Sequence, residues 1–291
     1  MSWLIFSLFA ACMQACRNAL QKQLSHTVPV LGVTLARFLY AVPIAVCYLA
    51  SFYLRDPSLS LPSFNRAFVL YVFAAAMVQI LATALMVQLF RLKNYAIGAG
   101  LARSEAILAA ILGVLFFGTQ LGLFGWLGIF IGTVAVFLLS GAGVRQLSLR
   151  VLVTGLSSGL CFALTSLWIR QAGLSLHIAP LHAAAWVLLS ILTLQAMALL
   201  FWLLAYDRAT LRKLLAQPRL AMATSTFSCL GSIGWFSAMC LQDVALVKTV
   251  GQIEVLFMLI ISAVFFKERL KKQDLLGLLF IVIAALLVVW A

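Results

Sequence analysis

The sequence predicts an all-α integral membrane protein of ten transmembrane helices, built as two inverted five-helix repeats. Three observations carry this prediction. Hydrophobic residues make up 65% of the chain and charged residues only 9%, with a mean hydropathy of +1.14, which is more apolar surface than a soluble fold buries. Apolar stretches of about 20 residues, the length of a spanning helix, follow one another with short connections. Two glutamates inside such stretches, Glu105 and Glu254, lie 254 − 105 = 149 positions apart in a chain of 291.

The expected spans end at turn residues and at charges. They are 2–24, 30–54, 66–91, 94–117, 120–142, 149–172, 180–206, 218–242, 244–266 and 272–291. The 149-residue offset also pairs Asn94 with Asp243 and Gly128 with Gly277, so we expect one repeat at 1–143 and a second at 144–291. Because five is an odd number of spans, the second repeat enters the membrane upside down relative to the first. Inverted repeats of this kind hold a substrate site near the membrane midplane.

Lysine and arginine are distributed unevenly between the two sets of connections. Those after the first, third, fifth, seventh and ninth spans hold thirteen, whereas the opposite set holds Arg55, Arg66 and Arg170, with the side of Lys248 undetermined. The positive-inside rule makes the basic set cytoplasmic and places both termini on the other side. The net charge of +13 therefore reflects topology, and we expect no nucleic-acid partner.

The first span carries a polar stripe. Gln14, Arg17, Asn18 and Gln21 are spaced i, i+3, i+4 and i+7, which is one face of a helix. Such a face must contact protein or water rather than lipid. The arginine favours a wet cavity, and a buried polar interface between helices is the alternative.

The third and eighth spans carry matching faces. The offset relates Gln79, Thr83, Met86 and Phe90 to Ser228, Ser232, Trp235 and Met239. Mildly polar faces with large adaptable side chains are typical of a binding wall, although such stripes also occur in plain helix cores. The repetition in both halves favours the wall.

The two glutamates each follow a second polar residue, Arg103 in one half and Gln252 in the other. Residues two apart lie about 200° apart around a helix, so one member of each pair is expected to face the cavity and the other a neighbouring helix. Gly251 permits close helix approach or a local break beside Glu254.

The second and seventh spans hold further polar candidates. Arg37 lies deep enough in its span to require a functional reason, and the offset relates it to Trp186, which we also expect at the cavity. His182, one turn before Trp186, is expected to be a hydrogen-bonded packing residue.

Motifs for enzymatic chemistry are absent from the sequence. It contains no zinc-protease, phosphate-loop or nucleophile-elbow motif, and its three histidines are not spaced as metal ligands. We therefore expect neither an enzyme nor a cofactor, and the six cysteines are expected to be packing residues.

The duplication and one local motif resemble the drug/metabolite transporter (DMT) superfamily, in its EamA-type ten-helix branch. The motif is Gly251-Gln-Ile-Glu-Val followed by Ala263-Val-Phe-Phe-Lys-Glu-Arg-Leu270, with Gly277 in the next helix. The first half departs from it, since Phe117-Gly118-Thr119-Gln120-Leu121 lacks the glutamate, and Val255 stands where many members have proline. The resemblance implies alternating-access transport of small metabolites, in several members coupled to protons.

From these observations we expect a monomeric transporter in a bacterial inner membrane, exporting a small polar or zwitterionic metabolite such as an amino acid. Glu105 and Glu254 are expected to bind the coupling proton, because desolvation favours the protonated carboxyl group. Arg17, Arg37 and Arg103 are candidates for holding a substrate carboxylate, which a guanidinium binds bidentately.

Other interpretations remain open. Both glutamates are alternatively neutralised by arginines on other helices, with a structural role only. Uptake of a cationic amine such as choline would place aromatic rings of Trp186, Trp235 or Tyr95 around the cation. A lipid flippase, a receptor or a subunit of a larger complex are alternatives from other classes.

Overall fold

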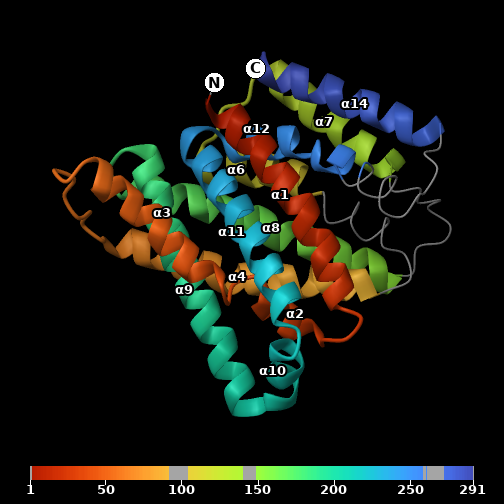
Figure 1. The fold of residues 1–291 in the computed structure, drawn as a ribbon. Coiled ribbons are helices and arrows are strands. Elements are labelled where there is room, and N and C mark those ends of the chain that lie inside the picture. Colours follow the sequence, from red (N-terminus) through yellow and green to blue (C-terminus); the bar gives the residue numbers. More distant parts are fainter. Residues whose placement is uncertain (1, 92–103, 140–148, 258–259, 261–271, 291) are drawn as a thin grey trace.

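The computed structural model describes residues 2–91, 104–139, 149–257, 260 and 272–290, and every regular element in these residues is an α-helix (Figure 1). The helices are α1 (Ser2–Leu24), α2 (Val30–Ala36), α3 (Ala41–Arg55), α4 (Arg66–Arg91), α6 (Glu105–Phe117), α7 (Leu123–Leu139), α8 (Leu149–Ser175), α9 (Pro180–Tyr206), α10 (Arg208–Leu215), α11 (Pro218–Leu241), α12 (Val244–Gly251) and α14 (Lys272–Val289).

Length and hydropathy indicate a multi-pass membrane protein. Within the described ranges, five stretches are long and apolar enough to cross a bilayer, and α6, α7 and α14 contain shorter apolar helices. The five stretches are Ser2–Leu24, Val30–Arg55, Arg66–Phe90, Leu149–Ser175 and Pro180–Tyr206.

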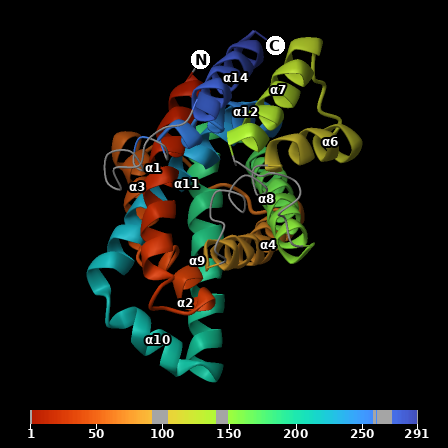
Figure 2. The same ribbon diagram turned by 90° about the vertical axis from the view of Figure 1, so that its right-hand side faces the viewer.

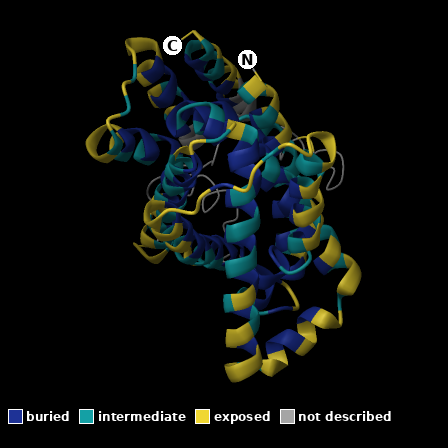
Figure 3. Ribbon diagram, turned by 90° about the vertical axis from the view of Figure 1, so that its left-hand side faces the viewer, coloured by how far each residue is buried: buried dark blue, intermediate teal, exposed yellow. Residues whose placement is uncertain are grey.

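The outer surface of the helices is apolar. Phe116 on α6, Phe130 on α7 and Phe201 on α9 have 72%, 61% and 73% of their surface exposed, and exposed residues line the outer helix faces while the centre is buried (Figure 3). A soluble monomer rarely exposes large apolar side chains in this density. Lipid is the solvent that fits this surface.

Three helix pairs have the most extensive contacts: α1 with α11, α4 with α8, and α7 with α14 (Figures 1 and 2). The first pair is held close by a glycine on α11. A Cβ at Gly234 would lie 2.8 Å from the backbone oxygen of Phe6 and 2.9 Å from the Cβ of Ala10, so only glycine permits this approach of α11 to α1. Both chain termini lie at the same end of the molecule.

Two spans are interrupted near polar residues. The stretch that begins with α2 turns at residues 37–40 before α3 starts, and Arg37 is the first residue of that turn. The second break follows α12, where Gln252 and Ile253 form a turn. The backbone nitrogens of Gln252 and Val255 bond to the oxygens three residues earlier, of Thr249 and Gln252, which is the tighter 3₁₀ pattern.

Helix α10 lies in the connection between the expected spans 180–206 and 218–242. Asp207 begins it by accepting a hydrogen bond of 3.1 Å from the Thr210 backbone nitrogen, as an N-cap residue does. Its side chains Thr210, Leu211 and Leu214 are buried. The burial of this face stabilises a helix too short to form alone.

Candidate functional site

A cavity of about 60 Å³ lies among α1, α4, α6, α8, α11 and α12. One water needs about 10–15 Å³ of such volume, so the cavity has room for several. Thirteen of the residues singled out from the sequence line it: Gln14, Arg17, Asn18, Arg37, Gln79, Met86, Phe90, Glu105, Ser232, Trp235, Met239, Gln252 and Glu254. The expected polar faces of the first, third and eighth spans therefore meet around one space.

Glu254 is fully buried and is held by two amides of α1. Its Oε1 accepts a hydrogen bond of 2.7 Å from Asn18 Nδ2, and its Oε2 one of 2.5 Å from Gln14 Nε2. Arg17 in turn donates to Asn18 Oδ1, at 2.8 Å from one guanidinium nitrogen. Trp235 Nε1 donates to Gln14 Oε1 at 2.8 Å. The polar stripe of α1 thus surrounds the carboxylate.

Glu105 is held by groups from two other helices. Its Oε1 accepts a hydrogen bond of 2.9 Å from Ser166 Oγ on α8 and lies 2.8 Å from Lys248 Nζ on α12. The Lys248 ammonium also lies 4.4 Å from the ring centroid of Trp235, a cation–π distance. Lys248 is not among the residues expected at the cavity, because its side of the membrane is undetermined from the sequence. A lysine inside an apolar span was itself a signal, since its burial is as unfavourable as that of a glutamate.

Arg37 is buried, with 4% of its surface exposed. Its Nη1 donates to Thr83 Oγ1 at 2.7 Å and its Nε to Ser228 Oγ at 3.2 Å. The rings of Phe38 and Phe162 lie 5.3 and 6.0 Å from its guanidinium carbon. Among the described residues, no carboxylate forms an ion pair with it, so neutral hydroxyls and rings surround this cation.

Four of the expected lining residues lie outside the cavity. Thr83 and Ser228 contact it indirectly, through Arg37. Gln21 is buried on α1, and neither side-chain amide atom has a hydrogen-bond partner in the described part of the chain. Trp186 instead donates to Tyr53 Oη at 3.2 Å and to His182 Nε2 at 3.1 Å. The packing role expected for His182 fits this network, and Arg103 lies outside the described residues.

Gln252 and Glu254, which are expected to point in different directions, both contribute to the cavity lining. The Gln252 amide also lies against α7, because a Cβ at Gly132 would overlap its Oε1, whereas Glu254 bonds to α1. The turn at 252–253 lies between the helical residues Gly251 and Glu254. Gly251 permits the arrangement, since a Cβ there would overlap the Trp235 indole.

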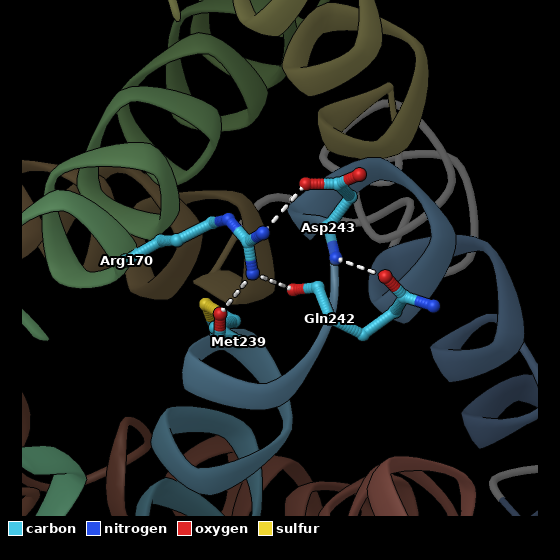
Figure 4. A network of polar contacts seen from close by, with 4 residues as sticks. All are labelled: Arg170, Met239, Gln242 and Asp243. Carbon is cyan, nitrogen blue, oxygen red and sulfur yellow. Dashed lines mark hydrogen bonds and ion pairs between the residues drawn. The ribbon is translucent and has the colours of Figure 1, made fainter. Parts of the chain in front are cut away.

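Beside the cavity, Arg170 on α8 holds the junction between α11 and α12 (Figure 4). It pairs with Asp243 at 2.8 Å and donates to the backbone oxygens of Met239 and Gln242 at 2.8 and 2.5 Å. These oxygens lie at the C-terminal end of α11, where a cation is favoured. Arg170 and Asp243 also line a second cavity of about 220 Å³. The sequence predicted only that Arg170 lies in a connection between spans on the non-cytoplasmic side.

The sequence profile described as "EamA-like transporter family" matches residues 1–141 and again 149–290. The chain belongs to the EamA-like transporter family. The resemblance to the DMT superfamily is thereby confirmed, and the protein is a multi-pass transporter of the DMT type. No curated protein matches the sequence.

Among solved structures, one described only as "Crystal structure of protein" superimposes with a TM-score of 0.73 at 15% identity. The match covers 99% of this chain and 98% of that one. At this identity the likeness shows the fold alone. For a transporter, a polar cavity surrounded by apolar helices is the candidate substrate site.

Proposed function

We propose that the protein is a secondary active transporter that exports a small zwitterionic metabolite, such as an amino acid, by alternating access in a bacterial inner membrane. The observation that carries this proposal is the position of Arg37. It is a buried guanidinium at the cavity, and its described hydrogen-bond partners, Thr83 and Ser228, are neutral. A buried cation is costly without a counterion, and a substrate carboxylate supplies one bidentately.

Two carboxylates in the same cavity make a zwitterion the best-fitting substrate. Glu105 already has an ion pair with Lys248. Glu254 is fully buried in the cavity, and its carboxylate oxygens accept hydrogen bonds from Gln14 and Asn18 of α1. We assign Glu254 as the residue that binds the coupling proton or the substrate ammonium, with Glu105 in a supporting role.

Support for two inverted five-helix repeats comes from contacts that the 149-residue offset relates. The offset converts Ser166 to residue 166 − 149 = 17, which is Arg17, and Glu105 to Glu254. Ser166 contacts Glu105, and the Arg17 neighbour Asn18 contacts Glu254. The first helix of each half packs closely on the third helix of the other half, as α1 does on α11 and α8 does on α4. Exchanging the two halves therefore converts one of these close pairs into the other. This is the pairing that a pseudo-two-fold axis generates.

Alternating access requires a contact that closes one end of the cavity and can open. We assign this role to Arg170, because its ion pair with Asp243 and its bonds to α11 join three helices at one junction. The charge distribution puts that junction on the non-cytoplasmic side. In this conformation the outer end is then closed.

Uptake of a cationic amine fits the cavity less well. Trp186 lies in a separate network with Tyr53 and His182, and the Trp235 ring already carries the Lys248 ammonium. Tyr95 lies outside the described residues.

The test is a thermal-shift screen of the purified protein against amino acids, amines, nucleosides, sugars and short-chain lipids at two pH values. A ligand that binds the folded state raises the midpoint by mass action. Stabilisation by amino acids that depends on pH and is weakened in Glu254→Gln supports the proposal. Stabilisation by lipids alone would indicate a flippase, and stabilisation by amines alone the uptake of cations.

A further inference from the structure

Glu105, Ser166 and Trp235 surround one ammonium group. Glu105 lies at the start of α6, Ser166 on α8 and Trp235 on α11, so three separate helices form the walls. Glu105 Oε1 lies 2.8 Å from Lys248 Nζ, the Trp235 ring centroid lies 4.4 Å from the same atom, and Ser166 donates to that carboxylate oxygen at 2.9 Å. A carboxylate beside an aromatic face is a common recognition chemistry for ammonium ions.

We propose that these three residues form an organic-cation site which the chain fills with its own Lys248, and that Lys248 thereby excludes free organic cations from this part of the cavity. This inference rests on the proposed role of the cavity as the substrate site. It assigns Lys248 as a specificity-determining residue, distinct from the groups that bind the substrate carboxylate.

The helix positions explain why the three wall residues remain when the Lys248 side chain is removed. Lys248 lies on α12, whereas none of the three wall residues does. Removing the lysine side chain therefore removes none of the wall groups, since the carboxylate, its serine donor and the ring lie on α6, α8 and α11. Trp235 is fixed further by its hydrogen bond of 2.8 Å to Gln14.

Tethering explains why a free cation does not displace Lys248. A group attached to the protein beside its binding site has an effective concentration in the millimolar range or above. Both Lys248 and Glu105 are largely buried, with 11% and 15% of their side chains exposed, and the attraction between them is stronger there than in water. A free amine must replace Lys248 in its ion pair with Glu105, and its own desolvation adds a further free-energy cost.

The cavity charge leads to the same expectation. Its lining residues in the described chain include three cations, Arg17, Arg37 and Lys248, and two carboxylates, Glu105 and Glu254. Without Lys248 the formal sum falls from 3 − 2 = +1 to 2 − 2 = 0. Glu105 also loses its ammonium partner, so the variant cavity gains affinity for a cation.

The experiment compares full-length wild type with Lys248→Met in detergent, using tetramethylammonium chloride as the probe and sodium chloride as the ionic-strength control. Methionine keeps the unbranched apolar stem and removes the charge. We expect tetramethylammonium to stabilise Lys248→Met at concentrations at least tenfold below any that affect the wild type. Lys248→Arg, which keeps a cation at the site, is expected to behave like the wild type. The double variant Lys248→Met/Glu105→Gln is expected to lose the effect.

Equal responses of wild type and Lys248→Met, or no response of a folded Lys248→Met, would overturn the inference. If Lys248→Met does not fold in plain buffer, expression and purification are repeated with tetramethylammonium throughout. Recovery of folded monomer only with this cation supports the site, and no recovery counts against it. Binding of tetramethylammonium by Lys248→Met, with no amino acid bound by the wild type, would keep this inference and reject the proposed function.

Discussion

Asn18 donates a hydrogen bond of 2.7 Å to Glu254, although 236 positions separate the two residues. The contact joins α1 to the helical residues that follow the turn at 252–253, and thus the first half of the chain to the second. Gln14, one turn earlier on α1, holds the other carboxylate oxygen. A carboxylate held between the two halves senses any movement of one half against the other. This geometry suits a coupling group better than one that only stabilises a single helix.

Replacing Glu254 by glutamine tests that role. The amide retains the shape and can still bond to Asn18 and Gln14, so we expect a folded monomer with little change in thermal stability. Ligand binding is expected to lose its dependence on pH, because glutamine cannot bind the proposed coupling proton. Glu105→Gln is the matched comparison and is expected to lower thermal stability more, since it leaves Lys248 buried without its carboxylate. If neither variant gives a folded monomer, the glutamates have a structural role.

Breaking the Arg170–Asp243 pair is expected to open the end of the cavity beside it. Cys240 is a native reporter of this opening, because it is 7% exposed and lies next to Met239, whose backbone oxygen accepts from Arg170. Arg170→Gln is expected to raise the rate of maleimide labelling at Cys240 severalfold, read by peptide mass spectrometry. The control is Arg66→Gln, which changes an exposed arginine at the start of α4 and should leave the labelling rate of Cys240 unchanged. Unchanged labelling of Cys240 would show that Arg170 does not close this junction.

The close contact of α1 with α11 predicts different effects for two glycines one turn apart. Gly234→Ala places a methyl group 2.8 Å from the Phe6 backbone oxygen, whereas Gly231→Ala places one no closer than 3.5 Å to its nearest neighbour. Overpacking of this kind costs about 1–3 kcal/mol. We expect a lower unfolding midpoint for Gly234→Ala and an unchanged one for Gly231→Ala. Equal midpoints would mean that α11 can move away from α1 without cost.

The cap of α10 predicts a local dependence on pH. Hydrogen bonds from the Thr210 side chain, and then from its backbone nitrogen, hold the pKa of Asp207 below its ordinary value of 3.8. A lowered pKa in the folded state means that the stabilisation is present above the ordinary value and is lost as the pH falls through the lowered one. The protection factor for amide hydrogen exchange in α10, which is corrected for the intrinsic exchange rate at each pH, should therefore be high at neutral pH and fall in strong acid. Asp207→Ala is expected to exchange rapidly at every pH, whereas Asp207→Asn, which keeps an acceptor, should remain protected.

The helix positions and the polar faces could be predicted from the sequence because both depend on local patterns. The expected spans 2–24, 66–91 and 180–206 coincide with α1, α4 and α9. The i, i+3, i+4 spacing placed Gln14, Arg17 and Asn18 on one face, and that face lines the cavity. Such patterns follow from helix geometry alone.

Features that depend on contacts between distant helices could not be predicted in this way. The turn at 252–253 follows no proline, and Gly251 alone did not distinguish a break from close packing. The role of Lys248 depends on its contacts with Glu105 and Trp235, which lie on other helices. Trp186 aligned with Arg37 at the repeat offset, yet its neighbours Tyr53 and His182 determine its place.

Binding of an amino acid and of its decarboxylated amine to wild type, Arg37→Gln and Arg37→Lys decides whether Arg37 holds the substrate carboxylate. The control is Arg66→Gln, which changes an exposed arginine at the start of α4. We expect the amino acid to stabilise the wild type and Arg66→Gln, the amine to stabilise neither, and Arg37→Gln to lose at least tenfold in affinity for the amino acid. The affinity of Arg37→Lys should lie between those of the wild type and Arg37→Gln, because lysine keeps the charge without the bidentate geometry. Equal stabilisation of wild type and Arg37→Gln by the amino acid would show that Arg37 does not bind the substrate.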